Sequence, residues 1–271
     1  MKVKKIISLA LALSLTAVMF SGCVKKSATG ADNSLDKIKE KGTFVLGLDS
    51  AFPPMGFEDE KGNIVGFDID VATEVSKKLG VTLKTQPIDW NAKEQELSTG
   101  KIDCIWNGFS VSEEREKNLT MTQPYMDNHM AIVVLNNSSI KTLADLKGKK
   151  LGLQGGSSAA DALDSKEDFK KSLGDVVEFK DNLTALMDLE AKGVDAVLMD
   201  DVAANYDITK NKKNYTVLSE SIATEEYAIG LRKGEIQLKD GIEKALKELK
   251  DDGTLAKIST KWFGKDVTKI K

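Results

Sequence analysis

Short apolar segments with strand character alternate with helical segments along this chain of 271 residues. In the first series, strands are predicted over Thr43 to Leu48, Thr82 to Gln86 and Ile102 to Trp106, and helices over Asp68 to Leu79 and Lys93 to Thr99. A glycine follows each of these helices, as is common at helix C-termini. Alternation of this kind predicts a mostly parallel sheet with helices on both faces.

The alternation starts again after the extended apolar run Met130 to Leu135. Three more strands, each leading into a helix, are predicted at Lys150 to Leu153, Val176 to Phe179 and Ala196 to Met199, and Asn182 is the expected N-cap of the middle helix. The chain closes with a strand over Tyr227 to Leu231 and two amphipathic helices, Gln237 to Leu249 and Thr254 to Phe263. A chain of this length suits two α/β lobes of about 100 residues each.

The first 22 residues have the pattern of an export signal. Three lysines precede an apolar stretch, Ile6 to Phe20, which is too short to span a bilayer. Phe20-Ser21-Gly22-Cys23 resembles the bacterial lipobox, although Phe20 departs from its usual aliphatic residue, and this predicts a lipid-modified Cys23. Residues 23–34 are then a lipid-anchored tether. The alternative is an ordinary signal peptide with an incidental cysteine, and both interpretations predict export.

Charge and cysteine content exclude several classes of function. Without the three signal-peptide lysines, the chain has 36 basic and 42 acidic residues, and this argues against a nucleic-acid partner. Cys104 is the only cysteine after residue 23, so no disulfide forms within the body, and it is expected to be a small buried hydrophobe. His129 is the only histidine, and neither a metal site nor a cofactor is predicted.

The segment Trp106 to Arg115 (WNGFSVSEER) places an arginine where a helix disfavours a cation. Gly108 is expected to end the preceding strand, and Ser112 to cap a helix whose first turn contains Arg115. The helix dipole disfavours a cation there by up to about 1 kcal/mol, so a negative ligand group is expected in front of Arg115. The alternative is that a neighbouring glutamate, at 113, 114 or 116, neutralises Arg115 on a solvated surface.

Two further segments place polar groups at the junction of a strand and a helix. Gln154-Gly155-Gly156-Ser157-Ser158 offers amides and hydroxyls to an anion, or is simply a turn. Asp200 and Asp201 follow a buried-looking strand, where they are either an N-cap pair or an acceptor for a substrate ammonium.

Loop aromatics complete the set of candidates. The prolines at 53 and 54 keep the loop after the first strand extended and present Phe52, and Trp90 also follows a strand. All candidates fall at or just past strand C-termini: Asp49, Phe52, Trp90, Ser110, Arg115, Gly156-Ser157 and Asp200. An arginine in one lobe and an aspartate in the other match the two charges of a zwitterion, so the simplest ligand is an L-α-amino acid.

These residues resemble the polar amino acid-binding proteins that serve ABC importers, solute-binding family 3. The resemblance runs from Leu35 to Gly264 through LGLDSAFPPMGFEDEKGNIVGFDIDVA, IDW, WNGFSVSEER, TQPYM, LADLKGKKLGLQGGSSA, GVDAVLMDDVAA, YAIGLRKG and LKDDGTLAKISTKWFG. It implies a periplasmic-binding-protein type II-like α/β fold with two doubly wound lobes. Lobe 1 would comprise residues 35–127 and 225–271, and lobe 2 residues 128–224, joined by hinge strands near Tyr125 to Met130 and Ile222 to Tyr227. The C-terminal helices would return to lobe 1.

The resemblance also implies a role for each candidate. Arg115, Ser110 and the groups around Ser157 would hold the ligand carboxylate, and Asp200 and the Gly108 carbonyl its ammonium. Asp49, Phe52 and Trp90 would line the side-chain pocket, with Glu58 and Met199 as weaker candidates. Gln154 and Ser158 stand where relatives vary, which leaves the specificity open among basic, amide-bearing and cystine-like amino acids.

The function expected from the sequence is therefore binding without catalysis. A monomeric lipoprotein on the extracytoplasmic face of the cell membrane would close around a polar amino acid and deliver it to an ABC permease and its ATPase. Two alternatives remain open. One is a dehydratase-like enzyme on the same fold, with Glu58, Asp49 or Asp200 as its acid, and the other is an amino acid-sensing module without transport.

Overall fold

The computed structural model describes residues 32–271, and the predicted signal peptide, Cys23 and the tether up to residue 31 lie outside them. Asp32 and Ser34, which were predicted to belong to the tether, are hydrogen-bonded to helix α9 (Ile236–Asp251) and so are part of the folded domain. The Asp32 carboxylate accepts from the amide of Gln237 at 2.5 Å, and the Ser34 hydroxyl accepts from the amide of Leu238 at 3.0 Å. Ser34 also begins the first helix, α1.

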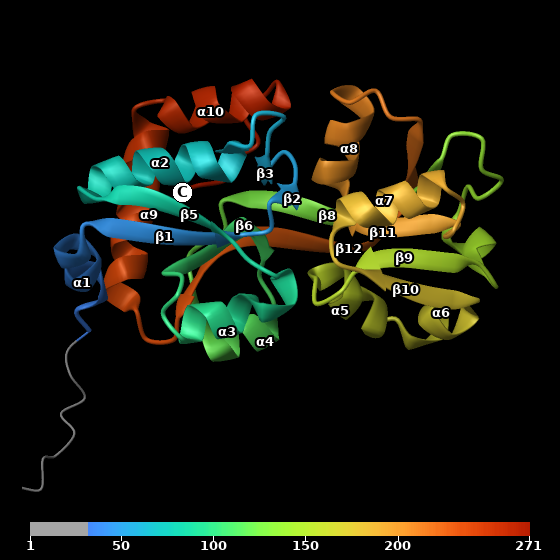
Figure 1. The fold of residues 1–271 in the computed structure, drawn as a ribbon, viewed down its shortest axis with the longest axis horizontal. Helices are drawn as coiled ribbons and strands as arrows, with labels where there is room; N and C mark the ends of the chain where they lie inside the picture. The colour runs from blue at the N-terminus through green and yellow to red at the C-terminus, as the bar shows by residue number, and fades with distance from the viewer. Residues whose placement is uncertain (1–31) are drawn as a thin grey trace, which may run out of the picture. The chain divides into compact units, whose positions relative to one another are not determined.

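Twelve strands form a large sheet and a small one in residues 32–271 (Figure 1). The large sheet has the order β10-β9-β11-β8-β12-β6-β1-β5, with β7 beside β12, and the small sheet is β2-β3-β4. The strands are β1 Thr43–Leu48, β2 Ala51–Phe52, β3 Gly56–Glu58, β4 Ile64–Val65, β5 Thr82–Pro87, β6 Cys104–Ser110, β7 Leu119–Met121, β8 Met126–Leu135, β9 Lys150–Gln154, β10 Asp175–Phe179, β11 Ala196–Asp200 and β12 Tyr215–Arg232.

Helices lie on both faces of the large sheet (Figure 1). They are α1 Ser34–Lys41, α2 Phe67–Leu79, α3 Lys93–Ser98, α4 Glu113–Asn118, α5 Ser158–Asp164, α6 Glu167–Ser172, α7 Asn182–Glu190, α8 Asp201–Thr209, α9 Ile236–Asp251 and α10 Thr254–Phe263, with short 3₁₀ turns η1 Trp90–Ala92 and η2 Leu143–Leu146. The mixed α/β class predicted from the sequence is confirmed.

The large sheet has a parallel group of strands at each end and antiparallel strands between them. The first strand group is β5, β1 and β6, and the second strand group is β10, β9 and β11. The long strands β8 and β12 pair with each other, with Met126 opposite Tyr227 and Leu135 opposite Tyr215, and connect the two groups. The segments predicted as hinges lie in this pair, and their hinge role stays a prediction.

Helix α2 shows why these segments fold as they do. Its buried apolar residues Phe67, Val71, Val75 and Leu79 recur at helical spacing, and Gly80 ends the helix in the left-handed conformation. The C-terminal helices α9 and α10 pack against each other and against α2, which contacts β5 and β6 of the first strand group. The indole of Trp262 in α10 donates to the Asp70 carboxylate at 2.8 Å.

Local predictions fail at two places. Gly108 does not end the strand, because its φ of 57° gives an irregularity through which β6 continues to Ser110. Asn182 is not the N-cap of α7, because the carboxylate of Asp181 accepts from the amide of Thr184 at 2.7 Å.

Cys104 is fully buried in the core, as predicted, and burial raises the pKa of its thiol. Within residues 32–271, no group of three or more histidine, cysteine, aspartate or glutamate side chains is arranged to hold a metal ion. None of the helices in this part of the chain is long and apolar enough to cross a membrane.

Candidate ligand pocket

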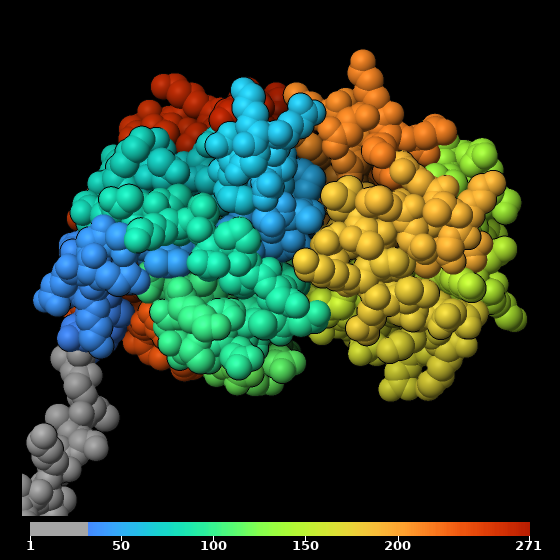
Figure 2. Space-filling view, viewed as in Figure 1, coloured from blue at the N-terminus to red at the C-terminus, as the bar shows by residue number. Residues whose placement is uncertain are grey.

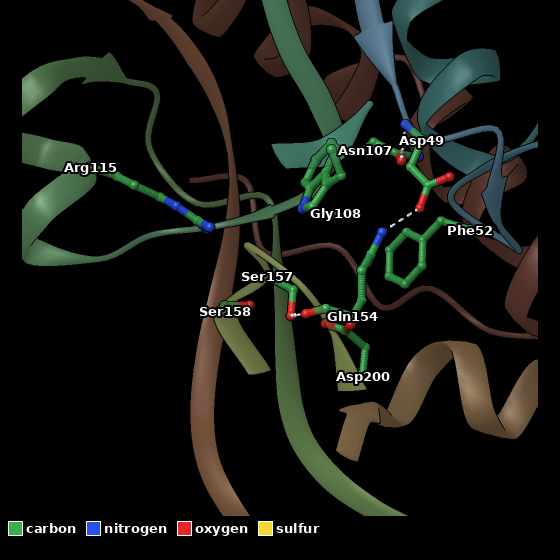
Figure 3. A pocket seen from close by; sticks show the side chains of 10 residues that line it. Asp49, Phe52, Asn107, Gly108, Arg115, Gln154, Ser157, Ser158 and Asp200 are labelled. Carbon is green, nitrogen blue, oxygen red and sulfur yellow. Dashed lines mark hydrogen bonds between the residues drawn. The ribbon is translucent and has the colours of Figure 1, made fainter. Parts of the chain in front are cut away.

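A small pocket lies where the two strand groups face each other (Figure 3). In the space-filling view, the part of the chain that carries the first strand group (blue to green) touches the part that carries the second strand group (yellow) (Figure 2). Seven of the eight predicted ligand-binding residues line the pocket, and Ser110 lies behind its wall. The lining residues are Asp49, Phe52, Trp90, Asn107, Gly108, Arg115, Gln154, Ser157, Ser158 and Asp200.

Arg115 points into the molecule from the third position of α4, whose N-cap is Ser112. Its side chain lies over the Phe109 ring at 4.2 Å, and Nη1 donates to the Ser110 carbonyl at 2.7 Å. Arg115 is buried, and no carboxylate of residues 32–271 lies within 4 Å of its guanidinium. Glu113 pairs with Lys117 instead. The alternative of an ion pair on a solvated surface is therefore wrong. Burial lowers the pKa of Arg115, although this group stays charged at any physiological pH.

Asp200 is the buried acidic group of the pocket. The hydroxyl of Tyr227 and the amide of Asn128 both donate to its Oδ1, at 2.6 and 2.7 Å, and no donor of the described residues reaches Oδ2. Its side chain makes no capping bond to α8, so it is not the simple N-cap considered above. Burial raises the pKa of Asp200 to about 7.

A second carboxylate, that of Asp49, joins the two sides of the pocket. Its Oδ2 accepts from the side-chain amide of Gln154 at 2.8 Å (Figure 3). Its Oδ1 accepts from the amide of Ala51 at 2.8 Å. The backbone amide of Asp49 donates to Asn107 at 3.0 Å. Burial raises the pKa of Asp49, and the negative charge of Asp181 adds to this, whereas the hydrogen bonds from Ala51 and Gln154 and the charge of Lys180 act in the opposite direction.

The aromatic side chains are walls rather than exposed lids. Phe52 and Trp90 are 5% and 7% exposed, and Trp90 packs edge-on against Phe109. Gly108 is required beside them, because a Cβ there would lie 2.8 Å from the Phe52 ring and its φ is already left-handed.

Serine hydroxyls of the pocket are partly used by the protein itself. The Ser157 hydroxyl donates to the Gln154 carbonyl at 2.7 Å. The Ser110 hydroxyl donates to Glu225 at 2.5 Å and lies 3.1 Å from that of Ser158. Ser110 therefore bridges strand β12 and helix α5 instead of facing the open space.

Sequence reasoning missed a layer of groups behind the pocket wall. Asp68, at the start of α2, is fully buried, and its Oδ2 accepts from the amide of Gly108 at 2.7 Å and the hydroxyl of Tyr125 at 3.0 Å. Asn107 was missed as a lining residue, and its signal was an amide inside an otherwise apolar strand. Of the weaker candidates, Glu58 is exposed in β3, and Met199 borders a separate cavity beyond Phe52.

The carboxyl group of Asp68 gives a pH test of stability. Burial raises its pKa to about 7, so the folded state binds this proton more tightly than the unfolded state does, and the stability that it contributes falls as the pH rises from about 4 to about 7. We expect the unfolding free energy of the ligand-free protein, relative to that of Asp68→Asn, to decrease by up to about 1.4 kcal/mol per pH unit across this window. Denaturant titrations at several pH values measure this.

The control for this test is Asp36→Asn, which changes an exposed acid in the first turn of α1. The unfolding free energy of the original protein relative to that of Asp36→Asn should not decrease as the pH rises from 4 to 7. A difference between the original protein and Asp68→Asn that stays constant from pH 4 to 7 would contradict the prediction.

An α/β chain with two strand groups and a small polar pocket between them has the architecture of the type II periplasmic binding proteins. The family described as bacterial extracellular solute-binding proteins, family 3, matches residues 44–265, and the chain belongs to this family. The resemblance seen in the sequence is thus confirmed.

Curated relatives include two L-cystine-binding proteins. TcyJ of Escherichia coli strain K12 is 34% identical over 237 residues, which are 87% of this chain and 88% of that protein. TcyA of Bacillus subtilis strain 168 is 29% identical over 275 residues, 98% of this chain and 99% of that protein.

Solved structures give the same picture. A substrate-binding protein of an ABC uptake transporter from Streptococcus pneumoniae with bound histidine superimposes with a TM-score of 0.85 at 38% identity, covering 88% of this chain and 98% of that one. An ancestral amino acid-binding protein described as a precursor of cyclohexadienyl dehydratase matches at 29% identity with a TM-score of 0.78, covering 85% of this chain and 99% of that one. These proteins are binding proteins, and the chain is a binding protein rather than an enzyme.

Proposed function

We propose that this protein captures a polar L-α-amino acid in the pocket between the two strand groups. The observation that carries the proposal is a pair of buried opposite charges, Arg115 and Asp200, each without an ion-pair partner within residues 32–271. An unpaired buried charge is costly, and the carboxylate and ammonium of one zwitterion neutralise both. The relatives named above, which bind cystine and histidine, support this ligand class.

The free atoms of these side chains suggest how the ligand is held. Nε and Nη2 of Arg115 donate to no group of the described residues, so they are available as a bidentate fork for a carboxylate. Oδ2 of Asp200 is available to the ammonium, and the Gly108 carbonyl and the groups around Ser157 complete the two ends.

The far end of the pocket selects the side chain of the ligand. Asp49 and Gln154 present a carboxylate and an amide there, and Phe52 and Trp90 form apolar walls. A basic, amide-bearing or cystine-like side chain combines polar ends with an apolar stem and suits this lining.

Capture would proceed by closure of two lobes, 35–127 with 225–271 and 128–224, about hinges in β8 and β12. The ligand then stabilises the closed state, which docks on an ABC permease coupled to an ATPase. As part of the same proposal, a lipid on Cys23 holds the monomer at the extracytoplasmic face of the membrane. Uptake of labelled ligand by cells with and without the gene separates transport from sensing alone.

Thermal unfolding across the twenty L-amino acids and L-cystine tests the ligand class. A ligand at 100 times its Kd adds about 2.7 kcal/mol to the unfolding free energy, which raises Tm by several degrees in a protein of this size. D-enantiomers are the matched controls, and mass spectrometry of small molecules released on denaturation identifies any ligand that co-purifies. Absence of a shift with all of them, after removal of co-purified ligand, would overturn the proposal.

A further inference from the structure

Lys93, the first residue of α3, is buried although the sequence places it at an ordinary helix start. Lys93 is 6% exposed, and no carboxylate of the described residues lies within 4 Å of its ammonium. Two carbonyl oxygens accept from Nζ instead, that of Trp90 at 3.2 Å and that of Gly156 at 2.9 Å. A lysine is almost never buried in this way without a specific partner.

The two carbonyls belong to opposite sides of the pocket. Trp90 precedes α3 beside the first strand group, whereas Gly156 lies between β9 and α5, 63 residues further along the chain from Lys93. The fit around Gly156 is tight, since a Cβ at this residue would lie 2.4 Å from the side-chain oxygen of Asn91. The ammonium thus holds one particular peptide group, that between Gly156 and Ser157.

The orientation of this peptide group matters for the pocket. The Gly156–Ser157 bond is trans, and in a planar trans peptide the C=O and the N–H point in opposite directions. When Lys93 holds the Gly156 carbonyl, the amide of Ser157 is therefore directed away from Lys93. Ser157 lines the pocket, and its amide donates to no group within residues 32–271.

We propose that Lys93 is a positioning residue that fixes the Gly156–Ser157 peptide so that the Ser157 amide donates to the α-carboxylate of the ligand. The cation on the carbonyl side also polarises the peptide and strengthens its N–H as a donor. This inference rests on the proposed function, because it assigns the amide to the carboxylate end of an amino acid.

The charges around Lys93 agree with this role. Burial first, and then the positive charge of Arg115, lower the pKa of Lys93 to about 8, while Glu94 and Asp161 oppose this. The ammonium is therefore still largely protonated at neutral pH, and two cations, Arg115 and Lys93, act on the same end of the pocket.

The test compares two ligands in two proteins. Lys93→Met keeps the length and the apolar stem of the side chain but removes the donor, and we expect it to weaken binding of the identified amino acid about tenfold, the usual worth of a charge-assisted hydrogen bond. For the α-carboxamide of the same amino acid, whose binding depends less on a strong donor, the loss should be at most about threefold. Isothermal titration gives both values, and circular dichroism establishes that the variant is folded.

Lys101→Met is the matched control, because Lys101 is exposed and pairs only with Glu96. It should change neither affinity. Lys93→Arg keeps a donor and should restore most of the discrimination between acid and carboxamide.

Equal losses for both ligands in Lys93→Met would assign Lys93 to general packing and overturn the inference, as would an unchanged affinity. If the original protein binds no amino acid, the proposed function itself has failed, and that result is distinct from either of these.

Discussion

Replacing Arg115 with alanine is expected to weaken ligand binding by at least about 30-fold while the fold persists. The guanidinium is buried and is the proposed partner of the ligand carboxylate. Truncating one member of a buried charge pair costs about 2–5 kcal/mol, which is a loss in affinity of at least about 30-fold. Isothermal titration measures the affinity, and the Tm of the ligand-free variant reports on its fold.

Two further variants make the Arg115 result specific. Lys117→Ala removes a cation from the same helix, but one that is exposed and lies beside Glu113, so affinity should stay unchanged. Arg115→Lys keeps the charge without the bidentate fork and should give an intermediate loss. Affinity within about threefold of the original in Arg115→Ala would show that the carboxylate is bound elsewhere.

The parts of the fold that the sequence predicts best are the strands and helices with strong periodicity. Helix α10 has the predicted bounds, and β1 and α2 agree to within a residue, because each carries a regular apolar pattern ended by a glycine or a polar loop. Strand β12 runs over 18 residues where only its last part was predicted. Its first part alternates with charged residues and is held by pairing with β8, which a local pattern does not reveal.

Residues of the pocket wall were predictable because they follow from topology. Parallel strands that feed helices deliver their C-terminal residues to one edge, so Asp49, Trp90, Arg115 and Asp200 meet once the alternation is recognised. Their individual roles remain predictions.

The groups behind the wall were not predictable in this way. Asp68 looks like an ordinary acid in the first turn of α2, and Lys93 looks like a solvated helix residue, yet both are buried and bonded to residues at least 40 positions away, Gly108 and Gly156. Burial of a charged residue depends on what packs over it, and sequence spacing contains no information on this. The same holds for Tyr227 and Asn128, which converge on Asp200 from the central strands.

Asp200 gives the second large effect, because its charge is the proposed partner of the ligand ammonium. Asp200→Asn keeps the shape of the side chain but removes the charge, and we expect a loss of affinity of about 2–5 kcal/mol at pH 8. Asp201→Asn is the matched control, since the neighbouring carboxylate is one-third exposed and faces His129 at 3.5 Å. It should leave affinity within about threefold.

The pH profile separates a charge partner from a mere packing residue. Burial raises the pKa of Asp200 to about 7 in the ligand-free protein, and an ammonium beside it would lower that pKa in the complex. The protein with ionised Asp200 binds the ligand. The affinity is therefore at its maximum above pH 7 and decreases as the pH falls below 7, by up to about tenfold per pH unit. Asp200→Asn has no proton to exchange at this position and should show a flatter profile between pH 5 and 8, measured by isothermal titration in buffers of different ionisation enthalpy. Parallel profiles for the two proteins would mean that the ammonium is neutralised by another group, with Asp49 as the first to examine because it is the other carboxylate that lines the pocket.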